Sequence, residues 1–279
     1  MDNPELYHKT NQMQRHNAGE IVREYLQNFN WRTEGPYTLI DLGSSIGDVL
    51  LEVVYPILDR KFNRIVCSDI NPGMIEYGKQ LFGEKIKNSE FRVFDIATTG
   101  DIPSDLKDQF DIVVSFFCLQ LIPDQRNALQ NIYSLLRPEG GNCLLTIFAR
   151  APYFEAYLHL SKTSKWSPYM GEVDKYTCCW HYCKDPENEL NGILEDIGFR
   201  DIDVKLRPTV YTYESFEAFK SNMKAVSHYC HRMPTSLQDE FISDFAEAMM
   251  RANPNFDHYD SDGKAFRLPF TQLVIFARK

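Results

Sequence analysis

Apolar and polar positions alternate along the first 150 residues in blocks that predict strands followed by helices. Short, largely apolar runs typical of buried strands occur at residues 37–42, 64–68, 91–94, 110–117 and 142–148. Apolar residues recur at steps of three and four, as in amphipathic helices, at residues 11–29, 46–58, 72–81 and 124–136. Pro56 is expected to bend or end the second of these helices. This alternation predicts an α/β fold with a doubly wound, mainly parallel sheet.

The pattern changes after residue 150. Residues 151–184 are rich in aromatic side chains and poor in glycine, which predicts a helical insertion over the carboxyl edge of the sheet. Asp185 and Pro186 are a typical helix start, and Gly198 is a typical stop. Helices at 215–226 and 236–250 are expected to complete a lid, and strands at 204–213 and 272–277 to pair antiparallel in a seven-stranded sheet. The predicted divisions are a core at 1–150, a lid insertion at 151–184, core completion at 185–213, a second lid part at 214–252, and a loop with the last strand at 253–279.

Charge and cysteine usage limit the partners. The net charge of −9 would repel a polyphosphate, and no Lys/Arg cluster reverses this locally, so we expect a small-molecule partner and no nucleic acid. No apolar run reaches the ~18 residues of a membrane helix, which predicts no membrane span. The seven cysteines and the absence of a secretory signal favour reduced thiols in the cytoplasm. The spacing of Cys178, Cys179 and Cys183 does not match zinc sites, so no metal is expected. For the oligomeric state, a homodimer is one open alternative.

Residues 39–47 are the strongest candidate for ligand chemistry, because a strand, an acid and a glycine-bearing turn open a helix there. Gly43 can adopt backbone angles closed to other residues and leaves bare backbone for a ligand. Asp69 ends the next strand, where a carboxylate can bind a ribose diol. A dinucleotide oxidoreductase would need Gly-x-Gly-x-x-Gly, whereas this turn offers only Gly43 and Gly47. We therefore expect an adenosine-bearing ligand.

The turn Asp41-x-Gly43-x-Ser45-x-Gly47 resembles the Asp/Glu-x-Gly-x-Gly-x-Gly loop of class I S-adenosylmethionine-dependent methyltransferases, with the middle glycine replaced by Ser45. Further matching pieces follow in order: Asp69, Asp95-Ile96, Phe110-Asp111 and the run Leu135-Leu136-Arg137-Pro138-Glu139-Gly140-Gly141. The resemblance implies a Rossmann-like fold and S-adenosylmethionine as cofactor.

A closer resemblance covers nearly the whole chain. It is carried by Leu6-Tyr7-x-x-x-Asn11-x-x-Gln14-Arg15, Asn30-Trp31-Arg32, Phe94-Asp95-Ile96, Ser115-Phe116, Asn131-Ile132-Tyr133-x-Leu135-Leu136, Lys165-Trp166 and Phe276-Ala277-Arg278-Lys279. These residues are similar to the insect juvenile hormone acid methyltransferase family. The resemblance implies conversion of a sesquiterpenoid acid, such as juvenile hormone acid or farnesoic acid, or of a related hydrophobic acid, to its methyl ester.

The resemblance also implies which residues bind the cofactor. They are Asp41, Gly43, Ser44, Gly47, Asp69, Ile70, Met74, Asp95, Ile96, Ser115 and Phe116. Asp69 would hold the ribose, or else cap the next helix. Asp95 and Ile96 would meet the adenine, or else Asp95 caps a loop. Asp41 would fix the glycine turn or the methionine amino group, and Phe116 has a plain core role as its alternative.

Three residues are candidates for the substrate end. Gln14 would orient the acid through its amide, or else act as a capping partner of Asn11. Where the family has His-Trp after Cys-Leu, this chain has Gln120-Leu121, so an indole N–H is replaced by an aliphatic side chain. Gln120 keeps an amide donor. This departure, with Ser45, leaves a second hypothesis open, namely a weak or silent family member that binds the cofactor or a terpenoid.

Overall fold

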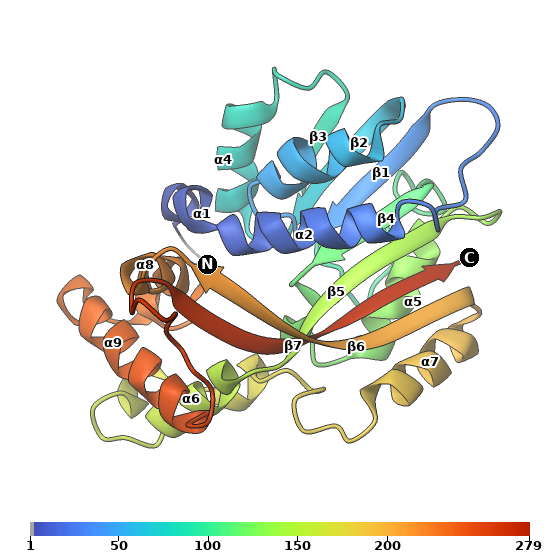
Figure 1. Ribbon diagram of the computed structural model, residues 1–279. Coiled ribbons are helices and arrows are strands. Elements are labelled where there is room, and N and C mark those ends of the chain that lie inside the picture. The colour runs from blue at the N-terminus through green and yellow to red at the C-terminus, as the bar shows by residue number, and fades with distance from the viewer. Residues whose placement is uncertain (1–2) are drawn as a thin grey trace. The chain divides into compact units, whose positions relative to one another are not determined.

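The structure of the chain is a computed structural model that describes residues 3–279 (Figure 1). These residues form two compact units. The unit that we call the sheet unit contains residues 14–147, 184–206 and 273–279. The helical unit contains the residues up to Met13 together with 148–183 and 207–272. Strands β5, β6 and β7 each contribute residues to both units.

A seven-stranded mixed sheet forms the centre of the fold. Its strands are β1 (Tyr37–Leu42), β2 (Phe62–Asp69), β3 (Ser89–Val93), β4 (Ile112–Phe116), β5 (Asn142–Arg150), β6 (Arg200–Tyr213) and β7 (Phe266–Arg278). Their order is β3-β2-β1-β4-β5-β7-β6, and β1 to β5 pair in parallel. The arrows of β6 and β7 point in opposite directions in Figure 1. The α/β fold with a doubly wound sheet is confirmed.

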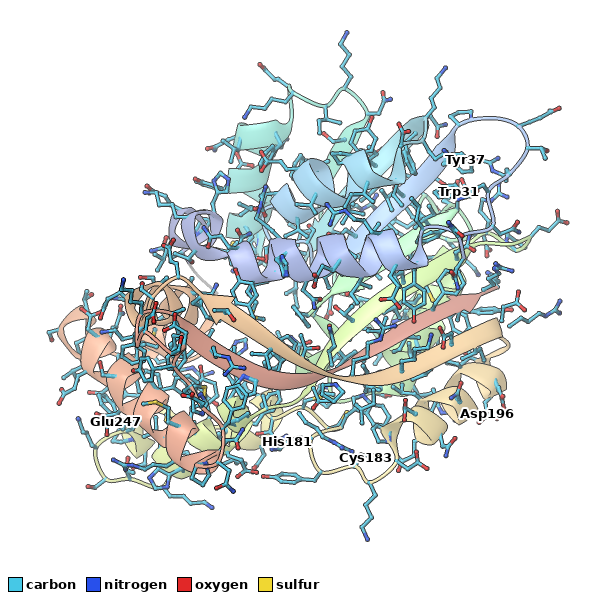
Figure 2. The ribbon with its side chains drawn as sticks, viewed as in Figure 1. Trp31, Tyr37, His181, Cys183, Asp196 and Glu247 are labelled. Atoms are coloured by element: carbon cyan, nitrogen blue, oxygen red, sulfur yellow. The ribbon has the colours of Figure 1, made fainter. Side chains whose placement is uncertain are left out.

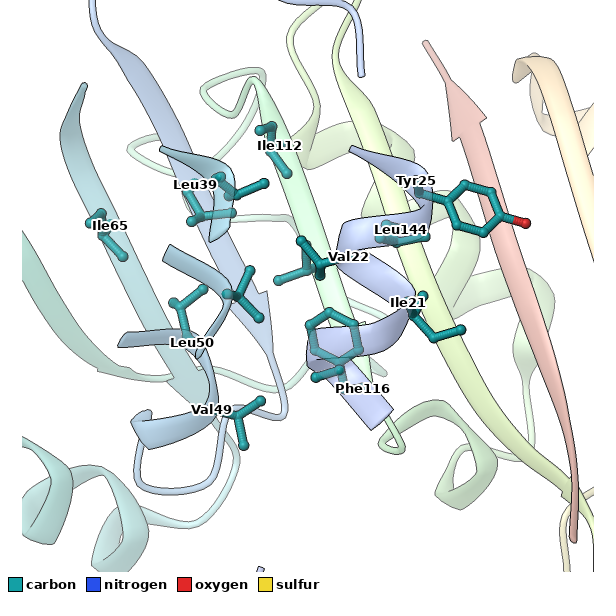
Figure 3. Close-up of a cluster of buried hydrophobic side chains, with 14 of the residues drawn as sticks. Ile21, Val22, Tyr25, Leu39, Val49, Leu50, Ile65, Ile112, Phe116 and Leu144 are labelled. Atoms are coloured by element: carbon teal, nitrogen blue, oxygen red, sulfur yellow. The ribbon is translucent and has the colours of Figure 1, made fainter. Parts of the chain in front are cut away.

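Helices cover both faces of the sheet in the sheet unit. They are α2 (Gln12–Tyr25), the π-helical segment η1 (Leu50–Val54), α3 (Tyr55–Leu58), α4 (Pro72–Phe82), α5 (Gln125–Leu135) and α7 (Pro186–Ile197). Val22 and Tyr25 of α2 belong to the same buried cluster as Leu39, Ile112 and Leu144 of the central strands (Figure 3). The carboxyl ends of the parallel strands remain available for a site because the helices pack on the faces.

Aromatic side chains hold the helical unit together. Its elements are α1 (Pro4–Thr10), α6 (Pro152–Leu160), α8 (Phe216–Val226), α9 (Thr235–Ala252) and the 3₁₀ turns η3 (Ser167–Tyr169), η4 (Val173–Tyr176) and η5 (Cys230–Arg232). The Tyr157 ring lies 4.7 Å from both Tyr153 and Phe245, and Trp166 donates its indole N–H to Asp244 at 2.8 Å. Of residues 151–184, only α6 is α-helical. No helix among the described residues is long and apolar enough to cross a bilayer.

The helix predicted over 11–29 is present as α2, which begins at Gln12 but ends at Tyr25, and a separate helix before it was not predicted. Asn3 caps a separate helix, α1, by accepting the amide of Leu6 at 2.9 Å, and Pro4 fills its first turn. Asn11 follows α1 with a ψ of 27°, so the helical conformation is interrupted there before α2 begins. The helix ends at Tyr25, because the next residues form turns.

Two further boundaries differ from the prediction. The helix that contains Pro56 passes through η1, where the amide of Tyr55 bonds to the carbonyl of Leu50, because a proline has no N–H for the normal helical bond. The last strand begins at Phe266, because Phe266, Leu268 and Phe270 are buried at alternate positions. Strand β3 likewise begins before its predicted start and ends at Val93.

One buried acid, Asp111, connects several segments at the amino-terminal ends of the parallel strands. Asp111 precedes β4 and accepts the backbone amide of Thr38 at 2.9 Å. The guanidinium nitrogens of Arg32 and Arg137 lie 2.9 and 3.0 Å from its other oxygen. Both oxygens of this carboxylate are therefore paired, Oδ2 with a backbone amide and Oδ1 with two guanidinium cations.

We expect that Asp111→Ala lowers the free energy of unfolding by about 3–5 kcal/mol, because two guanidinium groups and one amide lose a buried partner. Urea unfolding of the purified chain measures the loss. The control is the exposed Asp196, which is labelled in Figure 2. Asp196→Ala removes its pair with Arg126 at 2.8 Å and should cost less than about 1 kcal/mol. Equal losses in the two variants would contradict a structural role for Asp111.

Candidate functional site

The turn after β1 is held by β2. The amides of Gly43 and Ser44 both donate to the carbonyl of Ser68 at 2.8 Å. Gly43 has a φ of 74°, and a Cβ at this position would lie 2.3 Å from Sγ of Cys118. Glycine is required here both by its backbone angle and by the thiol that packs against it. The sequence pattern predicted the bare backbone but not this neighbour.

Ser45 has strained backbone angles inside the same turn. Its φ is 52°, in the left-handed region that favours glycine, and its side chain is buried. Its amide donates to Oδ2 of Asp69 at 2.9 Å, which holds the turn in this conformation. Ser45 therefore adopts a glycine-like conformation while it carries a Cβ and a hydroxyl. The following Gly47 also has a positive φ, 83°.

Asp69 connects the turn to helix α4. It ends β2, is 7% exposed, and accepts the amide of Asn71 at 2.8 Å through Oδ1. Burial raises the pKa of Asp69 above its usual value, and the amides of Asn71 and Ser45 oppose this shift. The next residue, Ile70, is an apolar side chain that is 64% exposed, whereas Met74 is buried in α4. Asp69 and Ile70 thus place a carboxylate beside an open apolar surface.

Asp41 is the most unusual acid of the site. It is 2% exposed, and Oδ1 accepts no hydrogen bond from any described residue. Burial, together with the nearby carboxyls of Asp69 and Asp48, raises the pKa of Asp41 to about 8. The hydroxyl of Ser44 is also buried and has no partner in the described part of the chain. Two polar groups at the tip of β1 therefore lack the hydrogen bonds that buried polar groups normally make.

The loop after β3 is positioned by α5. Asp95 accepts the amide of Ala97 at 2.8 Å, so the loop-capping role is present. The carbonyl of the buried Ile96 accepts the amide of Asn131 at 2.8 Å. Asn127 donates to the carbonyls of Ala97 and Thr98, both at 3.0 Å. Asn127 was not singled out from the sequence, because its contact is made only in the fold.

Residues at the end of β4 lie deeper than the sequence suggested. Ser115 is fully buried and donates its hydroxyl to the carbonyl of Leu42 at 2.7 Å. Phe116 belongs to the hydrophobic core of the sheet unit, which is the plain core role. Phe117 has a φ of 53°, a second strained position beside the glycine turn. Burial raises the pKa of the Cys118 thiol to about 12, so this thiol is neutral at pH 7.

The three substrate-end candidates all lie in the sheet unit. Gln14 lies near the start of α2, and its Oε1 is buried without a partner in the described chain, so the capping role toward Asn11 is not formed. Gln120 and Leu121 lie in the 3₁₀ turn η2 (Leu119–Leu121) after β4. The amide of Gln120 donates to the carbonyl of Phe117, and Leu121 is half-buried. Gln14 thus has a buried amide oxygen that can still accept a hydrogen bond.

Sequence reasoning missed an ion pair below the turn. Nη1 of Arg15 lies 2.8 Å from Oδ2 of Asp48, whose side chain is fully buried. The same nitrogen lies 2.8 Å from Glu52. The signal for Asp48 was an acid directly after Gly47 at the start of a helix.

These residues fit a cationic, adenosine-bearing cofactor. The unpartnered oxygens of Asp41 and Ser44 can accept from an ammonium group, and the acids favour positive charge. Asp69 offers a carboxylate for a ribose diol, and exposed Ile70 offers an apolar surface for a base. The donor and acceptor set thus agrees with S-adenosylmethionine.

Comparison with known proteins agrees with this geometry. A family model described as a methyltransferase domain matches residues 13–204. Juvenile hormone acid O-methyltransferase of Drosophila melanogaster is 36% identical over 279 residues, covering 100% of this chain and 93% of that protein. The protein of the same name from Bombyx mori is 31% identical, covering 100% of this chain and 98% of that protein.

Solved structures share the fold. The YcgJ protein of Bacillus subtilis superposes with a TM-score of 0.60 at 14% identity, covering 95% of this chain and 98% of that one. Phosphoethanolamine N-methyltransferase 2 of Haemonchus contortus, solved with S-adenosyl-L-methionine, gives a TM-score of 0.55 at 16% identity, with 95% of this chain and 52% of that one covered. The chain therefore belongs to the juvenile hormone acid O-methyltransferase family and is an S-adenosylmethionine-dependent carboxyl O-methyltransferase.

Proposed function

We propose that this enzyme methylates the carboxylate of a sesquiterpenoid acid, with juvenile hormone acid, farnesoic acid or a related hydrophobic acid as its substrate. The observation that carries the proposal is the 36% identity over the full chain with a relative named for this reaction. The buried, unpartnered acid at the tip of β1 adds a physical reason, because it suits a positively charged methyl donor.

We assign the cofactor contacts to residues of the sheet unit. Asp69 binds the ribose hydroxyls, and Ile70 lies against the adenine. Asp95 and Ile96 meet the adenine edge. The methionine end is bound by Asp41 and by the turn. The remaining members of the set are Gly43, Ser44, Gly47, Met74, Ser115 and Phe116. Ser115 and Phe116 are buried, so they act from below the surface that the cofactor contacts.

The reaction needs positioning more than acid–base chemistry. When bound, S-adenosylmethionine supplies an electrophilic methyl group on a positively charged sulfur. A carboxylic acid with a pKa near ~4.5 is ionised at pH 7, so no residue has to remove a proton from it. Gln14 orients the carboxylate by donating from its amide N–H₂, and the half-buried Leu121 excludes water beside it. Gln120 contributes if its amide leaves the carbonyl of Phe117.

The remaining assignments follow from composition. We propose that the segments 151–184 and 214–252, which carry the aromatic cluster of the helical unit, are the lid that the sequence predicted. We place the enzyme in the cytoplasm, acting on a small molecule and not on nucleic acid. A monomer and a homodimer are both compatible with this proposal.

A second candidate function is supported by two positions at which this sequence departs from the family's pattern. Ser45 places a Cβ at a left-handed position where the family has glycine, and Leu121 has no N–H to donate. A chain with these changes could retain a pocket for the cofactor or a terpenoid while it methylates poorly. Binding would then be its function.

The first test is direct. We expect that the purified chain with methyl-labelled S-adenosylmethionine converts farnesoic and juvenile hormone acids to labelled methyl esters, which extraction and chromatography detect. Farnesoic acid methyl ester, with its carboxyl blocked, is the control and should take up no label. Terpenoid binding without any labelled ester would contradict the enzyme and support the binding function.

Leu121→Trp should raise kcat/KM on farnesoic acid about tenfold, because an indole N–H adds a hydrogen bond to a charged carboxylate. Steady-state kinetics measure the change. Leu121→Phe is the matched control, since it adds an aromatic ring without a donor and should give no gain. If both variants respond equally, residue 121 acts through bulk rather than through hydrogen bonding.

Ser45→Gly should stabilise the chain by about 1 kcal/mol and tighten S-adenosylmethionine binding several-fold, because the left-handed strain is relieved and the Cβ is removed. Urea unfolding and calorimetry measure the two effects. Asp59→Gly is the control, because exposed Asp59 also has a positive φ, 44°, but lies outside the assigned contacts. It should gain stability alone. An unchanged affinity in Ser45→Gly would contradict our assignment of this Cβ.

A further inference from the structure

Two asparagines of α5 hold the loop that follows β3. Asn131 donates to the carbonyls of Ile96 at 2.8 Å and Thr98 at 2.9 Å. Asn127 donates to the carbonyls of Ala97 and Thr98, both at 3.0 Å. The two asparagines lie four positions apart in α5, so their side chains share one face of the helix. Three consecutive carbonyls of the loop are therefore bound to α5.

The bonds of Asn131 are shielded from water. Asn131 is 8% exposed and Ile96 is 5% exposed. An asparagine amide has two N–H donors, and Asn131 has two loop carbonyls within hydrogen-bonding distance. Water would not readily replace this amide if it were removed, so the carbonyls would lose partners that buried groups require. Asn131 therefore fixes the loop more firmly than an exposed side chain would.

The peptide group between Ile96 and Ala97 is held on both of its sides. Its carbonyl accepts from Asn131, and its N–H donates to Oδ1 of Asp95 at 2.8 Å. This peptide group is trans, so it is planar and its carbonyl and N–H point in opposite directions. Fixing the carbonyl therefore also fixes the N–H. Asn131 thereby sets the direction of the donor that holds the Asp95 carboxylate.

The Asp95 carboxylate keeps one oxygen for a ligand. The bond from Ala97 uses Oδ1, and the side chain of Asp95 is exposed. The second oxygen can accept a hydrogen bond from an amino group, because an ionised carboxylate only accepts. The 6-amino group of adenine is such a donor. The strength of that hydrogen bond depends on how well the carboxylate is held in direction.

We propose that Asn131 is a positioning residue for adenine binding, which orients the Asp95 carboxylate toward the 6-amino group of the base through the peptide group of Ile96 and Ala97. This inference rests on the proposed function, because the assignment of Asp95 to the adenine is made there. Asn131 does not touch the cofactor and acts on it only through the loop.

Enzyme kinetics give the first test. Binding energy at the base is the same before and during methyl transfer, so its loss raises KM without lowering kcat. For Asn131→Ala we expect the KM for S-adenosylmethionine to rise about tenfold, because two hydrogen bonds to the loop are lost. The kcat and the KM for farnesoic acid should change less than about twofold. Steady-state rates with labelled S-adenosylmethionine measure all three.

Calorimetry gives a readout that does not need catalysis. S-inosylhomocysteine has an oxygen in place of the 6-amino group of S-adenosylhomocysteine, so it presents an acceptor to Asp95 where adenine presents donors. The unmodified chain should bind S-adenosylhomocysteine at least about tenfold more tightly than S-inosylhomocysteine. Asn131→Ala should reduce this preference to about threefold or less, because Asp95 is no longer held in direction.

Asn127→Ala is the matched control. It removes two hydrogen bonds of the same kind to the same loop, but neither reaches the carbonyl of Ile96. Its preference for S-adenosylhomocysteine over S-inosylhomocysteine should stay within about twofold of the unmodified chain. If Asn131→Ala does not fold, Asn131→Asp keeps the shape of the side chain without its N–H donors and should lose the preference in the same way.

The outcomes separate this inference from the proposed function. An unchanged preference in Asn131→Ala, or equal losses in the variants of Asn127 and Asn131, would overturn the inference and leave the proposed function intact. The same would follow if the unmodified chain bound both thioethers equally. A preference that depends on Asn131, in a chain that forms no methyl ester, would support the inference and contradict the proposed function. No binding of S-adenosylhomocysteine would overturn both.

Discussion

The attachment of the glycine turn to strand β2 is the interaction on which the site depends. The carbonyl of Ser68 accepts two consecutive amides of the turn, and Asp69 accepts a third from Ser45. In return, the hydroxyl of Ser68 donates to the carbonyl of Asp41 at 2.8 Å. These bonds exist only because β1 and β2 are parallel neighbours, so that both strands end at the same edge of the sheet. The positions of Asp41, Ser44 and Asp69 follow from this pairing.

Buried acids at the two ends of the parallel strands have different surroundings. Asp111, before β4, is ion-paired with the guanidinium groups of Arg32 and Arg137. Asp41, at the carboxyl end of β1, has a vacant oxygen, and left-handed Ser45 and Phe117 lie in the adjoining turns. Unpaired acids and backbone strain are unfavourable for folding, and they cluster where a ligand would relieve them. The cofactor end of the sheet is therefore expected to be less stable alone than with its ligand.

Local signals in the sequence predicted most of the fold. The cap at Asp185 and the stop at Gly198 gave the bounds of α7, because capping depends on neighbouring residues. Helix α1 was missed, because it has only seven residues and no apolar periodicity was read before Asn11. The extra residues of β7 were missed because their alternation includes Pro269, which normally argues against a strand.

The candidate site was predictable to a lesser extent. The tips of β1 and β2 followed from the strand–turn–helix pattern, so Asp41 and Asp69 could be placed together. The thiol of Cys118 against Gly43 and the pair of Arg15 with Asp48 could not, because both contacts join residues far apart in the sequence. The lack of a hydrogen-bond donor to Oδ1 of Asp41 likewise depends on which residues the fold brings near it, and no local sequence pattern encodes this.

A crystal structure of the chain with S-adenosylhomocysteine would test the central claim most directly. Our account predicts the ribose hydroxyls on Asp69 and the methionine end beside Asp41 and Ser44. Ligand density at another place, or a turn whose side chains fill the space between the tips of β1 and β2, would contradict it.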